Sequence, residues 1–141
     1  MRLVIAFALD EPWSVIARLV AYGVYAAEIG IGVAVTTLKP RGVDRIIDLE
    51  AFSPTLDEPM VDLSQLVPGD DDVVMFSTPK VHHTVTAQYG RRRPRFIHLL
   101  QSGLAASAVG DVGYGYRLFQ KPMTRVVVAR EIRETILRLV G

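Results

Sequence analysis

Residues 3–9, Leu-Val-Ile-Ala-Phe-Ala-Leu, are apolar without interruption, and the polar turn Asp10-Glu-Pro12 stops the run. A strand without polar alternation is typical of a parallel sheet covered on both faces. Asp10 is placed to cap a helix that continues to about residue 29, with Pro12 in its first turn and Gly30 at its end. The beginning of the chain therefore predicts a buried strand followed by a helix.

The same alternation continues along the chain. We expect further strands at 31–38, 73–76, 95–101 and 125–129, and further helices at 79–89, 116–121 and 131–140. Three prolines break the acidic segment 41–70, so we expect it to be irregular, with a short strand at 45–49 and a helical turn near Leu63. The fold class that this predicts is α/β: a single Rossmann-like domain over residues 1–141, with a doubly wound, mostly parallel sheet and helices on both faces in three layers.

Composition excludes several kinds of protein. Half of the 141 residues are hydrophobic, so the chain has enough apolar surface to fold. The chain contains no cysteine, which excludes disulfides, thiolate metal sites and a cysteine nucleophile. Its three histidines lack the H-E-x-x-H spacing, and His82 and His83 diverge by about 100° around a helix, so we expect no metal site. No stretch of about 20 unbroken apolar residues predicts a membrane span, and we expect a cytoplasmic protein.

Charge is distributed unevenly between the two halves. Residues 1–70 hold five basic and ten acidic side chains, whereas residues 71–141 hold eleven basic and five acidic ones. The densest basic cluster consists of Arg91, Arg92, Arg93 and Arg95. It precedes a strand, which places it at the edge opposite the expected binding crevice, and no aromatic residues interleave with it, so we expect no nucleic-acid binding. A solvated loop is the simplest interpretation, and peripheral contact with anionic lipid at the inner membrane face is the alternative.

Ligands of doubly wound sheets bind at the carboxyl ends of the strands. The turn Ser77-Thr78-Pro79-Lys80 is the best local candidate, because a strand meets a helix N-terminus there and Lys80 adds a positive charge. Simple capping by Thr78 is the competing explanation. The turn after the first strand lacks the glycines of a dinucleotide-binding loop, and no P-loop or nucleophile elbow is present, so no cofactor is expected.

The first helix is unusually apolar. Between Trp13 and Ala27 only Ser14 and Arg18 are clearly polar, which makes a narrow polar stripe. Such a helix is suited to burial under a second domain or a second copy of the chain. An unusually apolar core helix explains the pattern equally well, so homodimerisation through this helix remains an alternative.

The second half resembles a known family. Asp72-Val-Val-Met-Phe-Ser-Thr-Pro, then a helix, then Arg95-Phe-Ile-His-Leu-Leu-Gln-Ser resemble the "D-V-V" and "F-x-x-Q" strands of the N-terminal domain of GT-B glycosyltransferases. Arg125-Val-Val-Val-Ala-Arg-Glu-Ile and the following helix resemble the last strand and helix before the domain junction. The likeness covers about residues 72–141, whereas residues 1–38 match only as a generic βαβ unit.

This resemblance implies a function of the retaining GT-B type. The chain would be the acceptor-side domain, and a second Rossmann-like domain or subunit would bind the nucleotide-sugar donor, so that a sugar passes to a hydroxyl acceptor. We expect no turnover by these 141 residues alone. Matching positions would place Thr78, Gln101 and Arg130 in the cleft between the domains. No catalytic residue is assigned, and the expected substrate-binding residues are Asp10, Ser77, Thr78, Lys80, His82, Gln101, Ser102 and Arg130.

The family pattern is incomplete in two places. Family members often have glycines after the first strand, where this chain has Asp10-Glu-Pro12, and a serine at the end of the last strand, where this chain has Ala129. Two other functions therefore stay open. One is a non-catalytic α/β binding or dimerisation module, and the other is a small nucleotide-binding enzyme of flavodoxin-like type.

Overall fold

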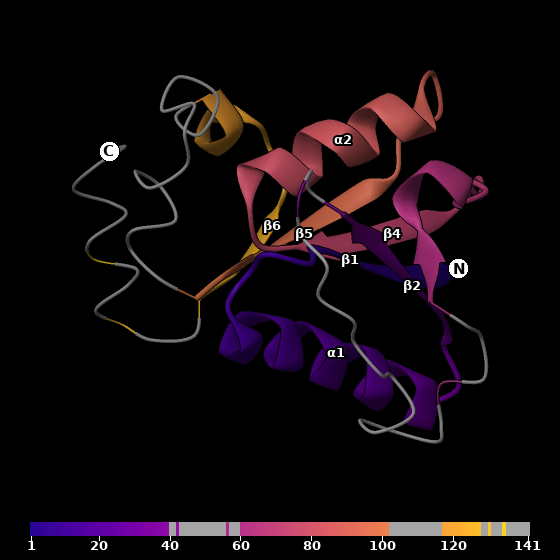
Figure 1. The fold of residues 1–141 in the computed structure, drawn as a ribbon, viewed down its shortest axis with the longest axis horizontal. Helices are drawn as coiled ribbons and strands as arrows, with labels where there is room; N and C mark the ends of the chain where they lie inside the picture. The colour runs from indigo at the N-terminus through magenta and orange to yellow at the C-terminus, as the bar shows by residue number, and fades with distance from the viewer. Residues whose placement is uncertain are drawn as a thin grey trace.

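The computed structural model describes residues 1–39, 60–101 and 117–127, together with residues 42, 56, 130 and 134. Figure 1 shows a central sheet with helices on either side of it. In chain order, the elements are β1 (Arg2–Ala8), α1 (Trp13–Glu28), β2 (Gly32–Leu38), β3 (Val61–Asp62), the 3-10 turn η1 (Leu63–Gln65), β4 (Asp72–Phe76), α2 (Pro79–Tyr89), β5 (Arg95–Leu100) and β6 (Thr124–Val127).

The six strands form one sheet in the order β3-β2-β1-β4-β5-β6, and every neighbouring pair is parallel. The start of β1 is in register with both of its neighbours, since Arg2 lies opposite Gly32 of β2 and Asp72 of β4. The predicted parallel α/β sheet is confirmed. This order is that of the Rossmann fold and differs from the 2-1-3-4-5 order of flavodoxin-like proteins. The strand order is therefore evidence against the flavodoxin-like alternative.

Two helices lie on opposite sides of the sheet, α2 above it and α1 below it in Figure 1. Successive side chains of a strand point to opposite faces. Accordingly, Val4 and Ala6 of β1 belong to a cluster with Val81 and Val85 of α2. The residues between them face the other way, and the second cluster joins β1 to α1 through Ile5, Phe7, Ile16, Leu19 and Val20. The central strands are thus covered by apolar side chains on both faces of the sheet, which explains why β1 lacks polar alternation.

Gly23 allows α1 to approach the sheet closely. A Cβ atom at this position would lie 3.1 Å from Cγ1 of Ile5 and 3.4 Å from Cγ1 of Val33. A glycine inside a helix costs about 1 kcal/mol in helix propensity, and here it accompanies tight packing of α1 onto β1 and β2. The helix ends two residues before Gly30, whose positive φ of 89° suits the predicted helix stop.

The structure differs from the sequence prediction in how the helices begin. Pro12, and not Asp10, is the N-cap of α1, and no side chain caps this helix. Asp10 is exposed, and the carboxylate of its neighbour Glu11 instead accepts a hydrogen bond from the backbone N–H of Ala8. Thr78 is the N-cap of α2, but its side chain makes no capping hydrogen bond either. The expected capping roles of both side chains are therefore wrong.

Other differences concern the ends of elements. The expected helical turn near Leu63 is confirmed as η1, and residues 117–120 form a helical turn within the predicted 116–121. The last strand begins at Thr124, one residue earlier than predicted. The predicted strand at 45–49, the loop at 102–115 and most of the helix at 131–140 lie outside the described residues.

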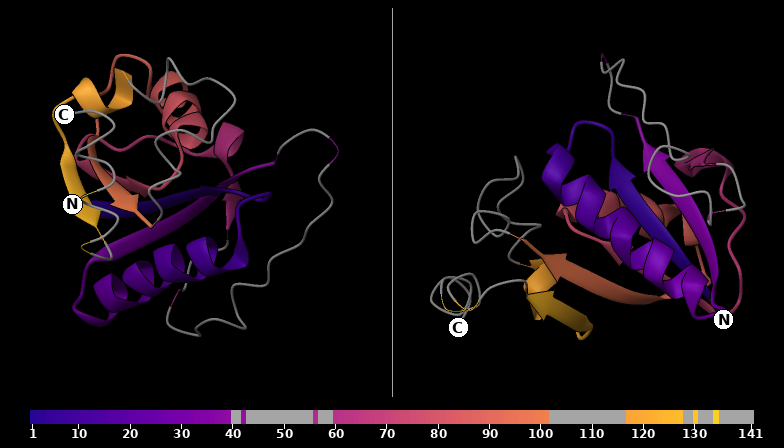
Figure 2. Two further views of the ribbon diagram at one scale, coloured as in Figure 1. Left: turned by 90° about the vertical axis from the view of Figure 1, so that its left-hand side faces the viewer. Right: turned by 90° about the horizontal axis from the view of Figure 1, so that it is seen from below.

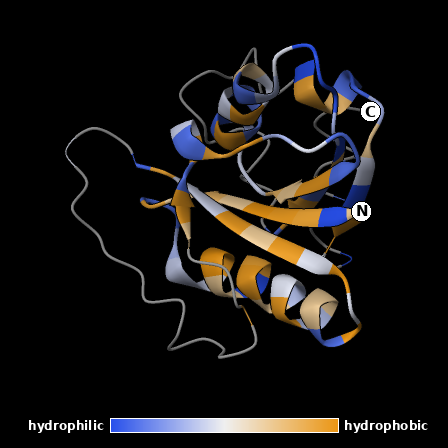
Figure 3. Ribbon diagram, turned by 90° about the vertical axis from the view of Figure 1, so that its right-hand side faces the viewer, coloured by the Kyte–Doolittle hydropathy of each residue, from blue (hydrophilic) through white to orange (hydrophobic). Residues whose placement is uncertain are grey.

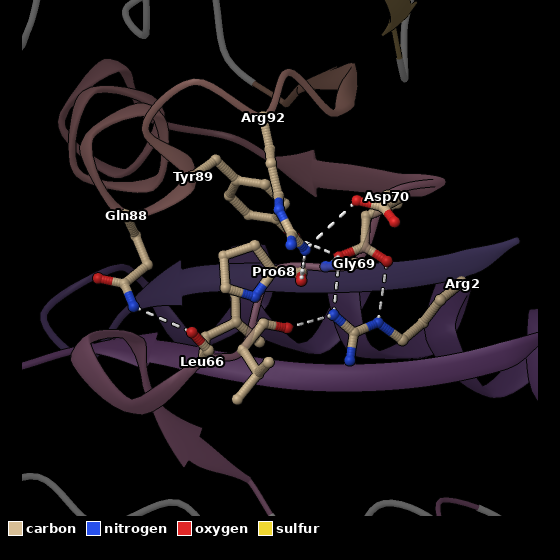
Figure 4. A network of polar contacts seen from close by, with 10 residues as sticks. Arg2, Leu66, Pro68, Gly69, Asp70, Gln88, Tyr89 and Arg92 are labelled. Carbon is tan, nitrogen blue, oxygen red and sulfur yellow. Dashed lines mark hydrogen bonds and ion pairs between the residues drawn. The ribbon is translucent and has the colours of Figure 1, made fainter.

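A buried carboxylate, that of Asp72, joins three elements at the amino edge of the sheet, where the parallel strands begin. Figure 4 labels its partners Arg2, Gly69 and Tyr89. Asp72 accepts hydrogen bonds from Nε and a terminal nitrogen of Arg2 at 3.0 and 2.7 Å, from the Tyr89 hydroxyl at 2.6 Å and from the Gly69 amide at 2.8 Å. Burial alone would raise the pKa of Asp72, but these hydrogen bonds bring it below the ordinary value. The network ties β1, β4 and α2 together at this edge.

Candidate binding site at the carboxyl edge of the sheet

The strand order reverses direction between β1 and β4. At such a switch point the connections from neighbouring strands run to opposite faces, and a crevice forms outside the carboxyl ends. Here the turn at residues 9–12 follows β1, and the turn at Ser77 and Thr78 follows β4. In Figure 1 this edge lies on the side of the sheet away from the marked N-terminus, and Figure 2 shows it from two further directions.

Gln101 links three elements at this edge. Its Nε2 donates to the Val15 carbonyl in the first turn of α1 at 3.1 Å and to Oγ of Ser77 at 3.3 Å. Ser77 follows β4, and its hydroxyl donates in turn to the Leu99 carbonyl of β5 at 2.9 Å. Both protons on Nε2 are therefore in use, and Oε1 of Gln101 has no partner among the described residues. This leaves a carbonyl oxygen able to accept a hydrogen bond from a ligand hydroxyl.

Thr78 and Gln101 lie at the same edge, because they come one or two residues after the carboxyl ends of β4 and β5, which are adjacent and parallel. Thr78 is half-buried, and its hydroxyl is not spent on capping. The first turn of α2 contains no acidic side chain, and Lys80 in that turn is exposed. Two of the expected binding groups, one hydroxyl and one amide, thus lie at the same edge as a helix N-terminus that favours negative charge.

His98 lies in β5, and its buried side chain supports the turn that follows β4. It is 1% exposed, and its ring stacks on Phe76 with centroids 4.7 Å apart. Its Nε2 lies 2.9 Å from the Ser77 carbonyl oxygen, which can only accept, so Nε2 carries a proton. Burial lowers the pKa of His98 to about 4, and the ring is neutral at pH 7. The side chain therefore fixes the backbone of the turn that carries Ser77.

Nδ1 of His98 is buried and has no hydrogen-bond partner within the described residues. With the proton on Nε2, Nδ1 holds a lone pair and can only accept. The sequence prediction did not single out His98. A polar residue within the otherwise apolar stretch Phe96–Leu100 is a signal that could have identified it, since buried polar groups usually carry a structural or chemical role.

Glu11, rather than Asp10, lies inside the protein at the end of β1. It is 4% exposed, and its Oε2 accepts from the Ala8 amide at 2.6 Å. Burial raises the pKa of Glu11 to about 7, although the Ala8 hydrogen bond opposes the shift. A carboxyl group that titrates near neutral pH beside a switch point is typical of functional sites. The sequence could not separate two adjacent carboxylates in the same turn.

Two of the other predicted residues contact residues outside the Gln101 network. His82 is 2% exposed, and its ring packs against Phe96 with centroids 4.5 Å apart and against Phe76 at 5.1 Å. Its position one helical turn after Thr78 directs it onto the sheet, and burial lowers its pKa to about 4, with the nearby Lys121 charge adding to the shift. Arg130 is strongly exposed and pairs with Glu134 at 3.1 Å.

Ser102, an expected substrate-binding residue, lies outside the described residues. Among those that the structure describes, no group of three or more His, Asp or Glu side chains is arranged to hold a metal ion.

Comparison of the chain with protein-family models, with curated protein sequences and with solved structures finds no match. None of the helices in the described part of the chain is long and apolar enough to cross a bilayer. The fold and the side chains at the carboxyl edge define a Rossmann-like α/β protein.

Proposed function

We propose that this chain is the acceptor-side domain of a retaining GT-B-type glycosyltransferase and that its carboxyl edge binds sugar hydroxyl groups. The observation that carries the proposal is the Gln101 network. It holds an amide oxygen that has no partner among the described residues at the switch-point edge, close to the Thr78 turn. The resemblance of residues 72–141 to the family adds the reaction class, and the Rossmann strand order is compatible with it.

The roles of the residues follow from their chemistry. Oε1 of Gln101 would accept a hydrogen bond from a hydroxyl of the acceptor, and the Thr78 hydroxyl could donate or accept beside it. Ser77 and His98 act as positioning residues, because both are buried and hold the turn through backbone contacts. The α2 N-terminus and Lys80 would favour a phosphate of the nucleotide sugar.

The transfer step itself would need a second Rossmann-like domain or subunit. In that reaction the acceptor oxygen bonds to the anomeric carbon, the bond from that carbon to the nucleoside diphosphate breaks, and the hydroxyl proton passes to the departing diphosphate or to solvent. Stabilising the departing diphosphate would fall mainly to the second domain. We therefore expect the 141-residue chain to bind sugars without turning over a UDP- or GDP-sugar. Measured turnover by the purified chain would contradict this division of roles.

Calorimetric titration with oligosaccharides bearing free hydroxyls and with UDP- and GDP-sugars tests the site. We expect Gln101→Leu to weaken binding about tenfold or more, the effect of one lost hydrogen bond at a desolvated site. Thr78→Val should also weaken binding while leaving the melting temperature nearly unchanged, because Thr78 makes no capping bond. Gln65→Leu, at an exposed position of η1, is the matched control. Equal affinities for all four proteins would refute the proposed site.

The second candidate function is a non-catalytic binding or dimerisation module. It is favoured by two large side chains exposed on α1, Trp13 at 51% and Tyr25 at 63%. Size-exclusion chromatography with light scattering on the wild type and on Trp13→Ser separates the two functions. A dimer that Trp13→Ser converts to a monomer supports the module, whereas a monomer unchanged by the substitution argues against it.

A further inference from the structure

The amino edge of the sheet, opposite the candidate binding site, combines exposed apolar and basic side chains. Of the five large hydrophobic residues that are exposed in the described part of the chain, four lie at this edge. They are Met1 at the start of β1, Tyr25 and Ile29 at the end of α1, and Val67 before β4, with exposed fractions of 70, 63, 58 and 76%. Isolated exposed apolar residues are ordinary, but their concentration at one edge is not.

The arginine cluster lies at the same edge. Arg91, Arg92 and Arg93 follow the end of α2, and Arg95 begins β5. All four are exposed, as is Lys121 shortly before β6. Figure 3 views the molecule from the right-hand side of Figure 1, and hydrophilic and hydrophobic segments both lie around the marked N-terminus. Exposed basic and apolar residues therefore lie at the same edge of the sheet.

Acidic groups at this edge neutralise only part of the charge. Asp70 pairs with Arg92 at 3.3 Å, and Asp71 lies 3.9 Å from the amino group of Met1. Glu28 is exposed near the end of α1. Within the described residues, Arg91, Arg93, Arg95 and Lys121 make no ion pair, so the surface keeps an excess of positive charge.

Residues of the arginine cluster line two hollows. One, of about 420 Å³, is mainly apolar and is lined by Met1, Tyr25, Ile29, Ile31 and Arg95 among others. The second, of about 450 Å³, is lined by Arg92, Arg93 and Lys121 over a floor that includes Phe96. Arginine residues thus line two hollows whose surfaces are both mainly apolar.

We propose that this amino edge is a peripheral docking surface for an anionic lipid bilayer. Basic side chains near an anionic membrane each contribute about fivefold to binding, while apolar side chains enter the boundary between headgroups and acyl chains. The four exposed apolar residues, and the arginines that make no ion pair within the described residues, supply both contributions at one edge of the sheet. Because the carboxyl edge is at the other end of the strands, a membrane-bound molecule would present its candidate sugar site to solvent.

Co-sedimentation of the whole chain with vesicles tests this proposal. We expect binding to vesicles that contain phosphatidylglycerol, little binding to pure phosphatidylcholine, and weaker binding at high salt. Arg93→Gln with Arg95→Gln should weaken binding about 25-fold, two fivefold contributions. Arg18→Gln with Arg117→Gln removes the same charge from other exposed positions and should have little effect.

A second variant tests the apolar contribution. Tyr25→Ser with Ile29→Ser should weaken vesicle binding about tenfold while leaving its salt dependence in place. Both side chains are exposed, so the fold should tolerate the change. If the Arg93/Arg95 and Arg18/Arg117 double variants lost vesicle binding equally, the effect would be one of overall charge, and the proposal would be overturned. Absence of vesicle binding together with binding to an acidic protein or to RNA would also overturn it.

Discussion

At the scale of single residues, the burial of Glu11 makes the stability of the folded protein depend on pH. Its carboxyl group is buried beside the turn after β1, and its pKa is raised from 4.5 to about 7. The folded protein therefore binds this proton more tightly than the unfolded chain does. The contribution of Glu11 to stability is fully present below pH 4.5 and is lost as the pH rises to 7, with a total of up to about 3 kcal/mol.

Glu11→Gln should remove this dependence, because the amide keeps the shape of the side chain and an oxygen for the Ala8 N–H. We expect the melting temperature of the variant to change less than that of the wild type between pH 4.5 and 7.5, and to be the higher of the two at pH 7.5. Thermal unfolding at half-unit pH steps measures this. Asp10→Asn, at an exposed neighbouring position, is the control. Parallel curves for the wild type and Glu11→Gln would contradict the assignment.

The sequence predicted some of the buried residues of the site and not others. Asp10 and Glu11 are adjacent carboxylates in one turn, and only the backbone path decides which of them enters the protein. Ser77 and Gln101 were expected at the site because each follows an apolar strand, and the structure brings them into contact. His98 escaped prediction because the surrounding strand is apolar and the resemblance assigns it no role.

At the scale of elements, Asp72 joins β1, β4 and α2. Asp72→Asn leaves Arg2 and Tyr89 facing an amide instead of a charge, and we expect a loss of about 3 kcal/mol in the free energy of unfolding at pH 7. Since the folded pKa of Asp72 is lowered, its contribution is present above the unfolded value of 3.8 and is lost as the pH falls through the folded value.

Urea unfolding at pH 7 measures this loss. Asp71→Asn is the matched control, since Asp71 is 75% exposed and its ion pair spans 3.9 Å, so its substitution should cost less than about 1 kcal/mol. A similar small loss for Asp72→Asn would show that the network does not hold the three elements together.

The elements themselves were predictable where the pattern was strong. The apolar runs at 3–9, 31–38 and 73–76 became β1, β2 and β4, because strands buried on both faces admit few polar residues. β3 was not predicted at Val61–Asp62, since two residues at a sheet edge carry no periodicity. The caps of α1 and α2 were predicted wrongly, because Asp and Thr side chains before a helix usually cap it. Here Asp10 is not the N-cap of α1, and the Thr78 side chain makes no capping hydrogen bond to α2.

At the scale of the whole molecule, the two edges of the sheet have different chemistry. The carboxyl edge holds a neutral polar network of Ser77, Gln101 and His98. The amino edge holds exposed arginines among exposed apolar side chains. All the strands are parallel, so each connection starts at the carboxyl edge and returns to the amino edge. Residues that follow strands and residues that precede strands therefore lie on different surfaces. Strand order decides which turns meet at the switch point, and the sequence did not reveal it.

The most direct measurement of the central claim is a map of backbone amide chemical shifts in the isotopically labelled chain as a sugar ligand is titrated in. The site proposed here predicts that the largest shifts fall in the turns after β1, β4 and β5, at Glu11, Ser77, Thr78 and Gln101. It also predicts small shifts at Arg91–Arg95. Shifts concentrated at the amino edge, or spread evenly over the molecule at saturating ligand, would contradict it.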